Sequence, residues 1–273
     1  MTEYRLDIER IYCIGDLHGN FDLLYNWLKR TDFENTLIII CGDIGLGFAK
    51  EAYYHQIFGG INTYCNERNI HLYAFRGNHD DPSYFNGEKI NYSNIKAIPD
   101  YSVIAANNGD AIHKILCIGG GTSIDRIPRI SRDRLKATYV AIHKGYTLDE
   151  AREVITLTYW DNEAPSYDPI ALGELHDIEV VCTHTSPSFV GFKDKKGIER
   201  YLNDDIDLEK DLDKERETMD MVYNDLIKNE NPIKQWIYAH FHTHMSEEYN
   251  GIQFTMLDMC REYNQKFDSL EIR

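Results

Sequence analysis

The chain has 273 residues, a formal net charge of −16 and a hydrophobic content of 42%. This hydrophobic content excludes a globally disordered chain, and the length suits one large domain or two small ones. The negative charge repels phosphate backbones and anionic lipids, so we expect neither long nucleic acid nor a membrane as a partner. No apolar run approaches the roughly 20 residues of a membrane-spanning helix.

Short apolar runs rich in β-branched residues predict the strands of the fold. Helical patterns separate several of them, as in FDLLYNWLKR at 21–30, and this alternation predicts an α/β domain. A second helix is predicted at 147–160, where Thr147 and Glu150 have the spacing of a capping box. In chain order the predicted strands are RIYCI (10–14), LIIIC (37–41), HLYAF (71–75), AIHKILCI (111–118), IEVVC (178–182), QWIYA (235–239) and IQFTML (252–257).

The segment 190–233 is predicted to be a helical insertion within a single domain that spans residues 1–273. Its stretch at 203–220 has nine acids and three bases, a pattern typical of a solvated helix face. Apolar residues from Met219 to Ile227 recur at helical spacing and would dock this helix, which Pro232 ends.

Four of the six cysteines occupy predicted strands, at positions 13, 41, 117 and 182. Free thiols buried in core strands favour a reducing compartment over a disulfide framework. The charged start MTEYRLDIER also lacks the apolar segment of a secretory signal, so we expect a cytoplasmic protein.

Metal-competent side chains follow five of the predicted strands, at the ends where α/β folds collect ligands. Each one alone has an ordinary interpretation as a helix cap, a turn residue or a satisfied histidine. Together, carboxylate, carboxamide and imidazole groups suit Mn, Fe or Zn better than calcium, and their number predicts two divalent metal ions. In chain order they are Asp16 and His18, Asp43, Asn78 with His79 and Asp80, His184, and His240 with His242.

In order and spacing, these blocks resemble the calcineurin-like metallophosphoesterases, including bacterial and phage members. The resemblance extends from about residue 10 to residue 258 and implies a four-layer α/β/β/α sandwich, with two mixed β-sheets flanked by helices and a dinuclear metal site at the edge. The matching blocks are D-L-H (16–18), G-D (42–43), G-N-H-D (77–80), H (184) and H-F-H (240–242).

The resemblance also implies a role for each of these residues. A hydroxide that bridges the two ions would attack phosphorus, and His79 would assist the leaving group. Asp80 is expected either to orient His79 or to cap a turn. One ion would be held by Asp16, His18 and His242, the other by Asn78, His184 and His240, and Asp43 would bridge them.

Two departures from the family pattern narrow the resemblance. The stretch GDIGLGFAK lacks the Asp-Arg pair of the Ser/Thr protein phosphatases, which disfavours that class. Ala239 replaces the usual glycine of the last block, and HFHTH permits a second register with His244. We prefer His240 and His242, because the predicted strand QWIYA leads directly into them.

The stretches CIGGGTSIDRIPR (117–129) and YWDNEAPS (159–166) also resemble segments of bacterial and phage-type phosphoesterases. Arg126 and Arg129 are candidate substrate-binding residues, since a guanidinium can hold a phosphate bidentately. Arg76, beside the third block, is a further candidate. The alternative is a surface loop whose arginines pair with nearby acids.

The sequence therefore predicts a metal-dependent phosphoesterase that hydrolyses a phosphate mono- or diester. The expected substrate is a phosphorylated small molecule, a nucleotide or a phosphoprotein, and the oligomeric state is left open. The alternative from a different class is a non-catalytic interaction module on the same fold, which the complete ligand set disfavours.

Overall fold

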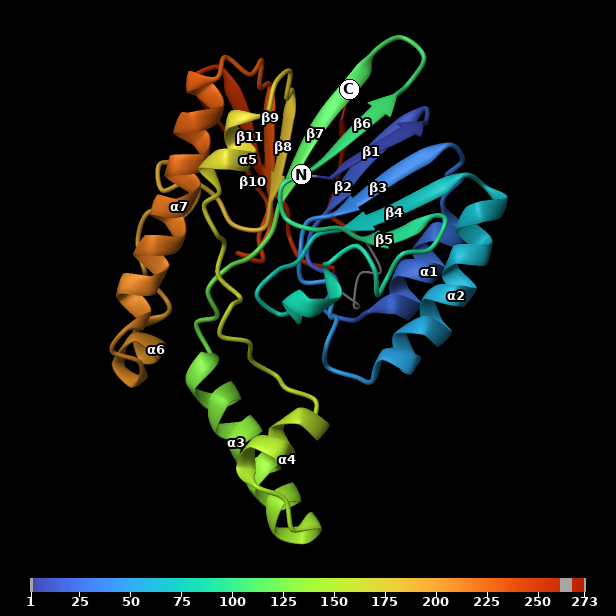
Figure 1. Cartoon of the computed structure of the whole chain (residues 1–273). Helices are drawn as coiled ribbons and strands as arrows, with labels where there is room; N and C mark the ends of the chain where they lie inside the picture. Colours follow the sequence, from blue (N-terminus) through green and yellow to red (C-terminus); the bar gives the residue numbers. More distant parts are fainter. Residues whose placement is uncertain (1, 261–266, 273) are drawn as a thin grey trace.

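Two β-sheets lie face to face in the computed structural model, and helices cover the outer side of each (Figure 1). The structure describes residues 2–260 and 267–272. None of the described helices combines the length and hydrophobicity that crossing a bilayer requires.

The smaller sheet has five strands in the order β12-β2-β3-β4-β5. The last four of these are parallel to one another, and β12 runs antiparallel to β2. Every residue of β3 is buried, as expected for a central strand that packs on both faces. The bounds are β2 (Arg10–Ile14), β3 (Thr36–Ile40), β4 (Ile70–Ala74), β5 (Ile95–Ala97) and β12 (Ser269–Ile272).

The larger sheet has seven strands in the order β1-β6-β7-β8-β9-β11-β10. It is mixed, because β6 runs antiparallel to β7 and β10 antiparallel to β11, whereas the other pairs are parallel. The bounds are β1 (Glu3–Asp7), β6 (Ser102–Asn107), β7 (Ile112–Ile118), β8 (Val180–Thr183), β9 (Gln235–Tyr238), β10 (Met245–Tyr249) and β11 (Ile252–Met256).

Three apolar clusters separate the four layers. One lies between the smaller sheet and helices α1 (Phe21–Arg30) and α2 (Glu51–Glu67). The second fills the space between the two sheets. The third lies between the larger sheet and helices α5 (Pro169–Gly173) and α7 (Leu208–Lys228). This arrangement confirms the predicted α/β class with two mixed sheets flanked by helices.

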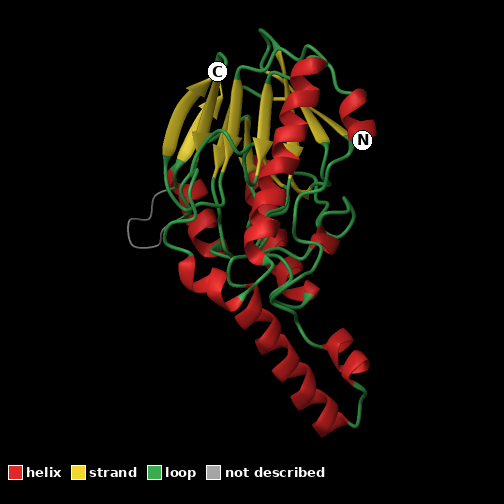
Figure 2. Cartoon of the chain, turned by 90° about the vertical axis from the view of Figure 1, so that its left-hand side faces the viewer, coloured by secondary structure: helices red, strands yellow, loops and turns green. Residues whose placement is uncertain are grey.

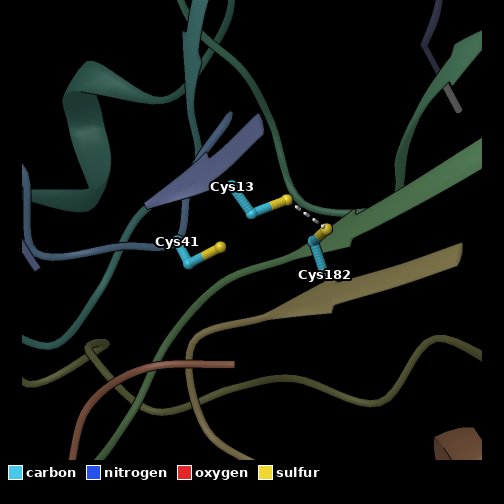
Figure 3. Close-up of side chains that lie close together, drawn as sticks. All are labelled: Cys13, Cys41 and Cys182. Atoms are coloured by element: carbon cyan, nitrogen blue, oxygen red, sulfur yellow. Dashed lines mark hydrogen bonds between the residues drawn. The ribbon is translucent and has the colours of Figure 1, made fainter. Parts of the chain in front are cut away.

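Cysteines contribute to the layer between the sheets. Cys13 on β2, Cys41 just after β3 and Cys182 on β8 point toward one another (Figure 3). Their sulfur atoms lie within 4.8 Å of one another, and the Sγ atoms of Cys13 and Cys182 are 3.6 Å apart. All are free thiols, and burial raises the pKa of Cys13 and Cys41. They therefore pack as small apolar side chains.

Two helices, α3 (Arg126–Lys144) and α4 (Leu148–Val154), form an arm that extends away from the sheets (Figures 1 and 2). The predicted capping box between Thr147 and Glu150 is confirmed. The prediction of helix as far as residue 160 was wrong, because the helix ends at Val154. The carboxylate of Asp133 accepts hydrogen bonds from the backbone of Thr158 and Tyr159, which holds this segment outside a helix.

The segment 190–233 contains α6 (Glu199–Asp204) and α7, and α7 ends four residues before Pro232. The apolar stripe of α7 packs against the larger sheet, with Met219, Val222 and Leu226 almost fully buried. The interpretation of this segment as an insertion in a single domain stays a prediction. A short 3₁₀ turn, η1 (Pro82–Tyr84), completes the described elements.

Candidate metal centre

The carboxyl ends of five strands meet at one edge of the two sheets. β2, β3 and β4 of the smaller sheet end there, as do β8 and β9 of the larger one. The loops that follow these strands bring together all seven predicted metal ligands, which are Asp16, His18, Asp43, Asn78, His184, His240 and His242.

The first group of ligands consists of Asp16, His18, Asp43 and His242. One ligand atom from each lies within 4.8 Å of all the others. His242 Nε2 is 3.0 Å from Asp16 Oδ2 and 3.1 Å from His18 Nε2, which in turn is 3.8 Å from Asp43 Oδ2. Two imidazole nitrogens and two carboxylates directed at one point form a donor set that suits a divalent transition metal.

The second group consists of Asn78, His184, His240 and again Asp43. His184 Nε2 lies 2.9 Å from Asn78 Oδ1 and 3.4 Å from Asp43 Oδ1. His184 Nδ1 lies 2.8 Å from the carbonyl of Cys41, which can only accept, so Nδ1 carries a proton and Nε2 is the nitrogen that faces the oxygens of Asn78 and Asp43. The ring of His240 is 4.9 Å from that of His184.

Asp43 lies between the two groups. Its Oδ1 faces His184 and its Oδ2 faces His18, as a bridging carboxylate requires. Burial acts to raise the pKa of Asp43, but the charges of His184, His79 and His18 outweigh burial and hold the pKa below its usual range.

The charge and burial of the carboxylates at this edge are suited to binding cations. Asp16 and Asp43 are almost fully buried, and within the described ranges no lysine or arginine forms an ion pair with either. The buried Asp16 Oδ2 also accepts no well-formed hydrogen bond. Since an uncompensated buried carboxylate is costly, these groups require positive charge from histidines or from metal ions.

The backbone at this edge is strained. Four of the seven ligands have a positive φ, a region that residues other than glycine seldom occupy. They are His18 (47°), Asp43 (46°), His240 (70°) and His242 (52°). Strain of this kind persists where the surrounding structure imposes it, and it concentrates at functional sites.

Two glycines make room for the ligands. A Cβ on Gly77 would lie 2.0 Å from Asp43 Oδ1, and one on Gly42 would lie 2.2 Å from His184 Nδ1. Gly42 also has a φ of 93°. Only glycine at these two positions allows the loops after β3 and β4 to approach His184 and Asp43 this closely.

His79 lies beside the first group, with its ring 5.4 Å from that of His18. It lines a cavity of about 710 Å³ together with Asp43, Asn78, His240 and His242. Burial lowers the pKa of His79 to about 4, an effect that Asp43 opposes and Arg129 increases. The side chain thus shares a cavity with four of the predicted metal ligands.

Asp80 binds the backbone. Its two oxygens accept hydrogen bonds from the amides of Gly77, Ile44, Gly45 and Leu46 at 2.7–3.2 Å. These bonds tie the loop after β4 to the loop after β3, and none of them involves the His79 ring. They are contacts of the kind that the turn-capping alternative expects, because Asp80 accepts from backbone amides of both loops.

Arg76 does not face the metal ligands. Its guanidinium donates to Asp100 Oδ2 at 2.9 Å and to the carbonyls of Glu163 and Ala164 at 2.6 and 3.0 Å. The side chain is almost fully buried by these contacts. They give no support to the predicted role in substrate binding and instead fix the loop 162–164.

Arg126 and Arg129 lie at the base of the arm. Arg126 pairs with Asp205 and with Asp211, the latter at 2.6 Å, which links α3 to α7. Arg129 donates through Nη1 to Ser123 Oγ at 2.6 Å, while its buried Nη2 has no partner among the described residues. Of the three predicted arginines, only Arg129 therefore keeps an unused buried donor near the ligands.

Glu163 was missed as a site residue, although the stretch YWDNEAPS that contains it was singled out. It is buried and accepts from the Ser123 amide at 2.6 Å and from Ser123 Oγ at 2.7 Å. Ser123 Oγ in turn accepts from Asn78 Nδ2 at 2.9 Å, which leaves Asn78 Oδ1 beside His184. Glu163 thus orients a metal ligand through one intermediate hydroxyl.

Glu215 of α7 was also missed, because it lies in the acidic run read as a solvated face. It is only 3% exposed and accepts from the Thr122 amide at 2.5 Å and from the Thr185 hydroxyl. His240 Nε2 lies 3.9 Å from its Oε1. The available signal was its spacing, since Glu215 is four residues before Met219 and therefore continues the apolar stripe.

Fold and ligand set together define a metal-dependent hydrolase with a site at the strand ends of an α/β/β/α sandwich. A sequence model described as calcineurin-like phosphoesterase matches residues 9–269. The chain belongs to this family and is a metal-dependent phosphoric ester hydrolase. A search of curated proteins finds no match.

Solved structures provide further resemblances. The chain is 12% identical to the phosphopantetheinyl hydrolase of Mycobacterium tuberculosis, with a TM-score of 0.42 and coverage of 97% of this chain and 96% of that one. It is 13% identical to a protein serine/threonine phosphatase of Saccharomyces cerevisiae, with a TM-score of 0.34 and coverage of 94% and 71%.

Proposed function

We propose that this protein hydrolyses a phosphate ester of a small molecule at a centre of two divalent ions, either manganese, iron or zinc. The observation that carries the proposal is the pair of ligand groups on either side of Asp43, with one carboxylate oxygen facing each. Ions bound there would lower the pKa of a coordinated water and hold the phosphoryl oxygens.

Other residues of the chain would orient the metal ligands and assist the leaving group. Ser123 and the Cys41 carbonyl hold Asn78 and His184 in the orientation that directs Oδ1 and Nε2 at the centre. His79, on the wall of the cavity, would donate a hydrogen bond from its N–H to the leaving oxygen of the ester.

The cavity supports a small-molecule substrate over a phosphoprotein. Its volume of about 710 Å³ is that of a typical small-ligand site. Phe192 and Phe241 line it with ring centroids 5.9 Å apart, and they would pack against a flat or apolar part of the substrate, such as a nucleotide base. Lys193 and Lys196 also line the cavity, together with acids such as Asp194 and Glu217.

Several of these lining residues belong to the segment 190–233, which supports the proposal that this segment shapes access to the site. The free, buried cysteines support a reducing compartment, and we propose a cytoplasmic location on this ground.

The test combines metal analysis with two synthetic substrates. Protein purified without chelator is expected to contain about two metal ions per chain. In added manganese it should hydrolyse p-nitrophenyl phosphate or bis-p-nitrophenyl phosphate, and the preferred ester separates monoesterase from diesterase.

Asp43→Asn and His240→Ala should both abolish turnover and lower the metal content. His244→Ala is the matched control, because His244 is 55% exposed and bonds to Asp268 outside the ligand groups. Full activity in both ligand variants would refute the proposal. Metal-free protein without turnover would favour a non-catalytic module.

A further inference from the structure

Two aromatic side chains, Phe192 and Phe241, form one wall of the cavity that contains the metal ligands. Phe241 stands between the ligands His240 and His242 in the chain, and its ring centroid is 4.9 Å from that of His240. The ring centroid of Phe192 is 5.9 Å from that of Phe241, with the ring planes inclined at 63°. This aromatic wall therefore begins directly beside a metal ligand.

Phe241 is held in place by its neighbours. The guanidinium carbon of Arg216 lies over its ring, 5.2 Å from the centroid, and the ring of Tyr238 packs edge-on at 6.2 Å. Arg216 is itself fixed, because its Nη2 donates to the carbonyl of Pro187 at 2.8 Å and to that of Val190. These contacts position the ring in the absence of a ligand, and a preformed surface costs little ordering on binding.

Phe192 is 47% exposed, although its loop is anchored on both sides. Before it, the Gly191 amide donates to Glu247 Oε1 at 2.5 Å, and after it Lys195 pairs with Asp213 at 2.7 Å. The loop thus holds a large aromatic ring half in solvent at the edge of the site. A ligand that covers this ring gains the free energy of burying its apolar surface.

The rest of the lining sets the charge of what can lie there. Ile124, Ile198 and Leu212 are each only partly buried and extend the apolar surface. Besides Asp43, the described lining holds four lysine or arginine side chains and five acids, so it carries no excess of positive charge. The phosphoryl group would be held at the metal centre, whereas a second anionic group on the same molecule would meet as many acids as bases.

We propose that the site selects phosphate esters whose leaving group carries an uncharged planar ring, and that Phe192 determines this preference by packing against the ring. The inference rests on the proposed function, because it names the substrate class of the same site. It disfavours polyanionic esters, such as nucleoside triphosphates and multiply phosphorylated sugars. Phe192 is the residue to test, since a change at Phe241 would also disturb the flanking ligands.

Binding of two phosphonates, which cannot be hydrolysed as esters, tests the inference. Calorimetric titration of the Mn²⁺-loaded full chain with phenylphosphonate and methylphosphonate compares a ring with a methyl group on the same anion. The wild type is expected to bind phenylphosphonate about 10-fold more tightly. Phe192→Ala should bring this ratio close to one, and Phe192→Tyr should retain it. Tyr53→Ala on α2 is the matched control with the wild-type ratio, because Tyr53 is 48% exposed and lies outside the cavity lining.

A charged ring tests the second part of the inference. The ligand para-carboxyphenylphosphonate adds one carboxylate and should bind less tightly than phenylphosphonate. Equal affinity of the wild type for phenylphosphonate and methylphosphonate, an undiminished ratio in Phe192→Ala, or tighter binding of the carboxylated ring would overturn the inference.

These binding readouts are separate from turnover. A preference for the ring in a protein that hydrolyses no ester would refute the proposed function and uphold the aromatic subsite. Hydrolysis without a preference for the ring would refute this inference alone. If neither phosphonate binds the Mn²⁺-loaded protein, both are wrong.

Discussion

Replacement of Glu215 tests whether α7 helps to organise the metal centre. The carboxylate of Glu215 joins the loops after three neighbouring strands, through Thr122 after β7, Thr185 after β8 and His240 after β9. We therefore expect this single side chain to contribute both to folding stability and to metal affinity.

The magnitude follows from the contacts. Glu215→Ala leaves two buried donors without an acceptor, at about 1–3 kcal/mol each, so the free energy of unfolding should fall by roughly 2–6 kcal/mol. Loss of the carboxylate beside His240 should weaken metal binding about 10–100-fold, as for other groups that orient metal ligands. Glu215→Gln keeps the volume and one acceptor, so it should lose less stability than the alanine variant.

The assay is urea unfolding of the metal-free protein, followed by titration with Mn²⁺ while metal content is measured. Glu209→Gln is the control on the same helix, because Glu209 is 68% exposed and its one ion pair among the described residues, with Lys195, is a contact worth little. If Glu215→Gln and Glu209→Gln bind metal equally well, the assigned role of Glu215 is wrong.

Three further predictions concern the same site. Gly77→Ala should remove metal-dependent turnover, because its Cβ would lie 2.0 Å from Asp43 Oδ1. The control is Gly59→Ala on α2, whose Cβ would meet nothing within 4 Å and which should raise the free energy of unfolding by about 0.5–1 kcal/mol. Equal activity of the two variants would contradict this prediction. Chelation should lower the melting temperature by roughly 5–10 °C. Mn²⁺ at a hundred times its dissociation constant should restore the melting temperature, because its binding then stabilises the folded state by about 2.7 kcal/mol. A melting temperature insensitive to chelator would count against bound ions. Burial raises the pKa of Glu163 from 4.5 to about 7, although its hydrogen bonds from Ser123 act to lower the pKa. As pH rises, Glu163 therefore loses its proton in the unfolded chain before it does so in the folded one, and the free energy of unfolding falls as pH rises from 4.5 through 7. Relative to wild type, Glu163→Gln should therefore gain about 3 kcal/mol between pH 4.5 and 8 in metal-free urea unfolding, and a pH-independent difference would refute the assignment.

Local patterns in the sequence determined the strands of the centre and its ligands. The runs at 10–14, 37–41 and 235–239 are apolar because β2, β3 and β9 are central strands. Strands such as β1 and β10 were not predicted, since EYRLD and MSEEY lie at sheet edges and face solvent on alternate residues. Edge strands need little burial and therefore leave a weak hydrophobic signal.

The tertiary structure decided which polar residues lie together. Glu215 is 199 residues from Asp16 in the sequence and looks like its solvated neighbours, yet docking of α7 buries it beside His240. Arg76 has the sequence context of a substrate ligand, but the loop 162–164 occupies its donors. Such roles depend on contacts between segments distant in the chain. The sequence determines the order of the ligands, whereas packing of the layers determines the neighbours of each one.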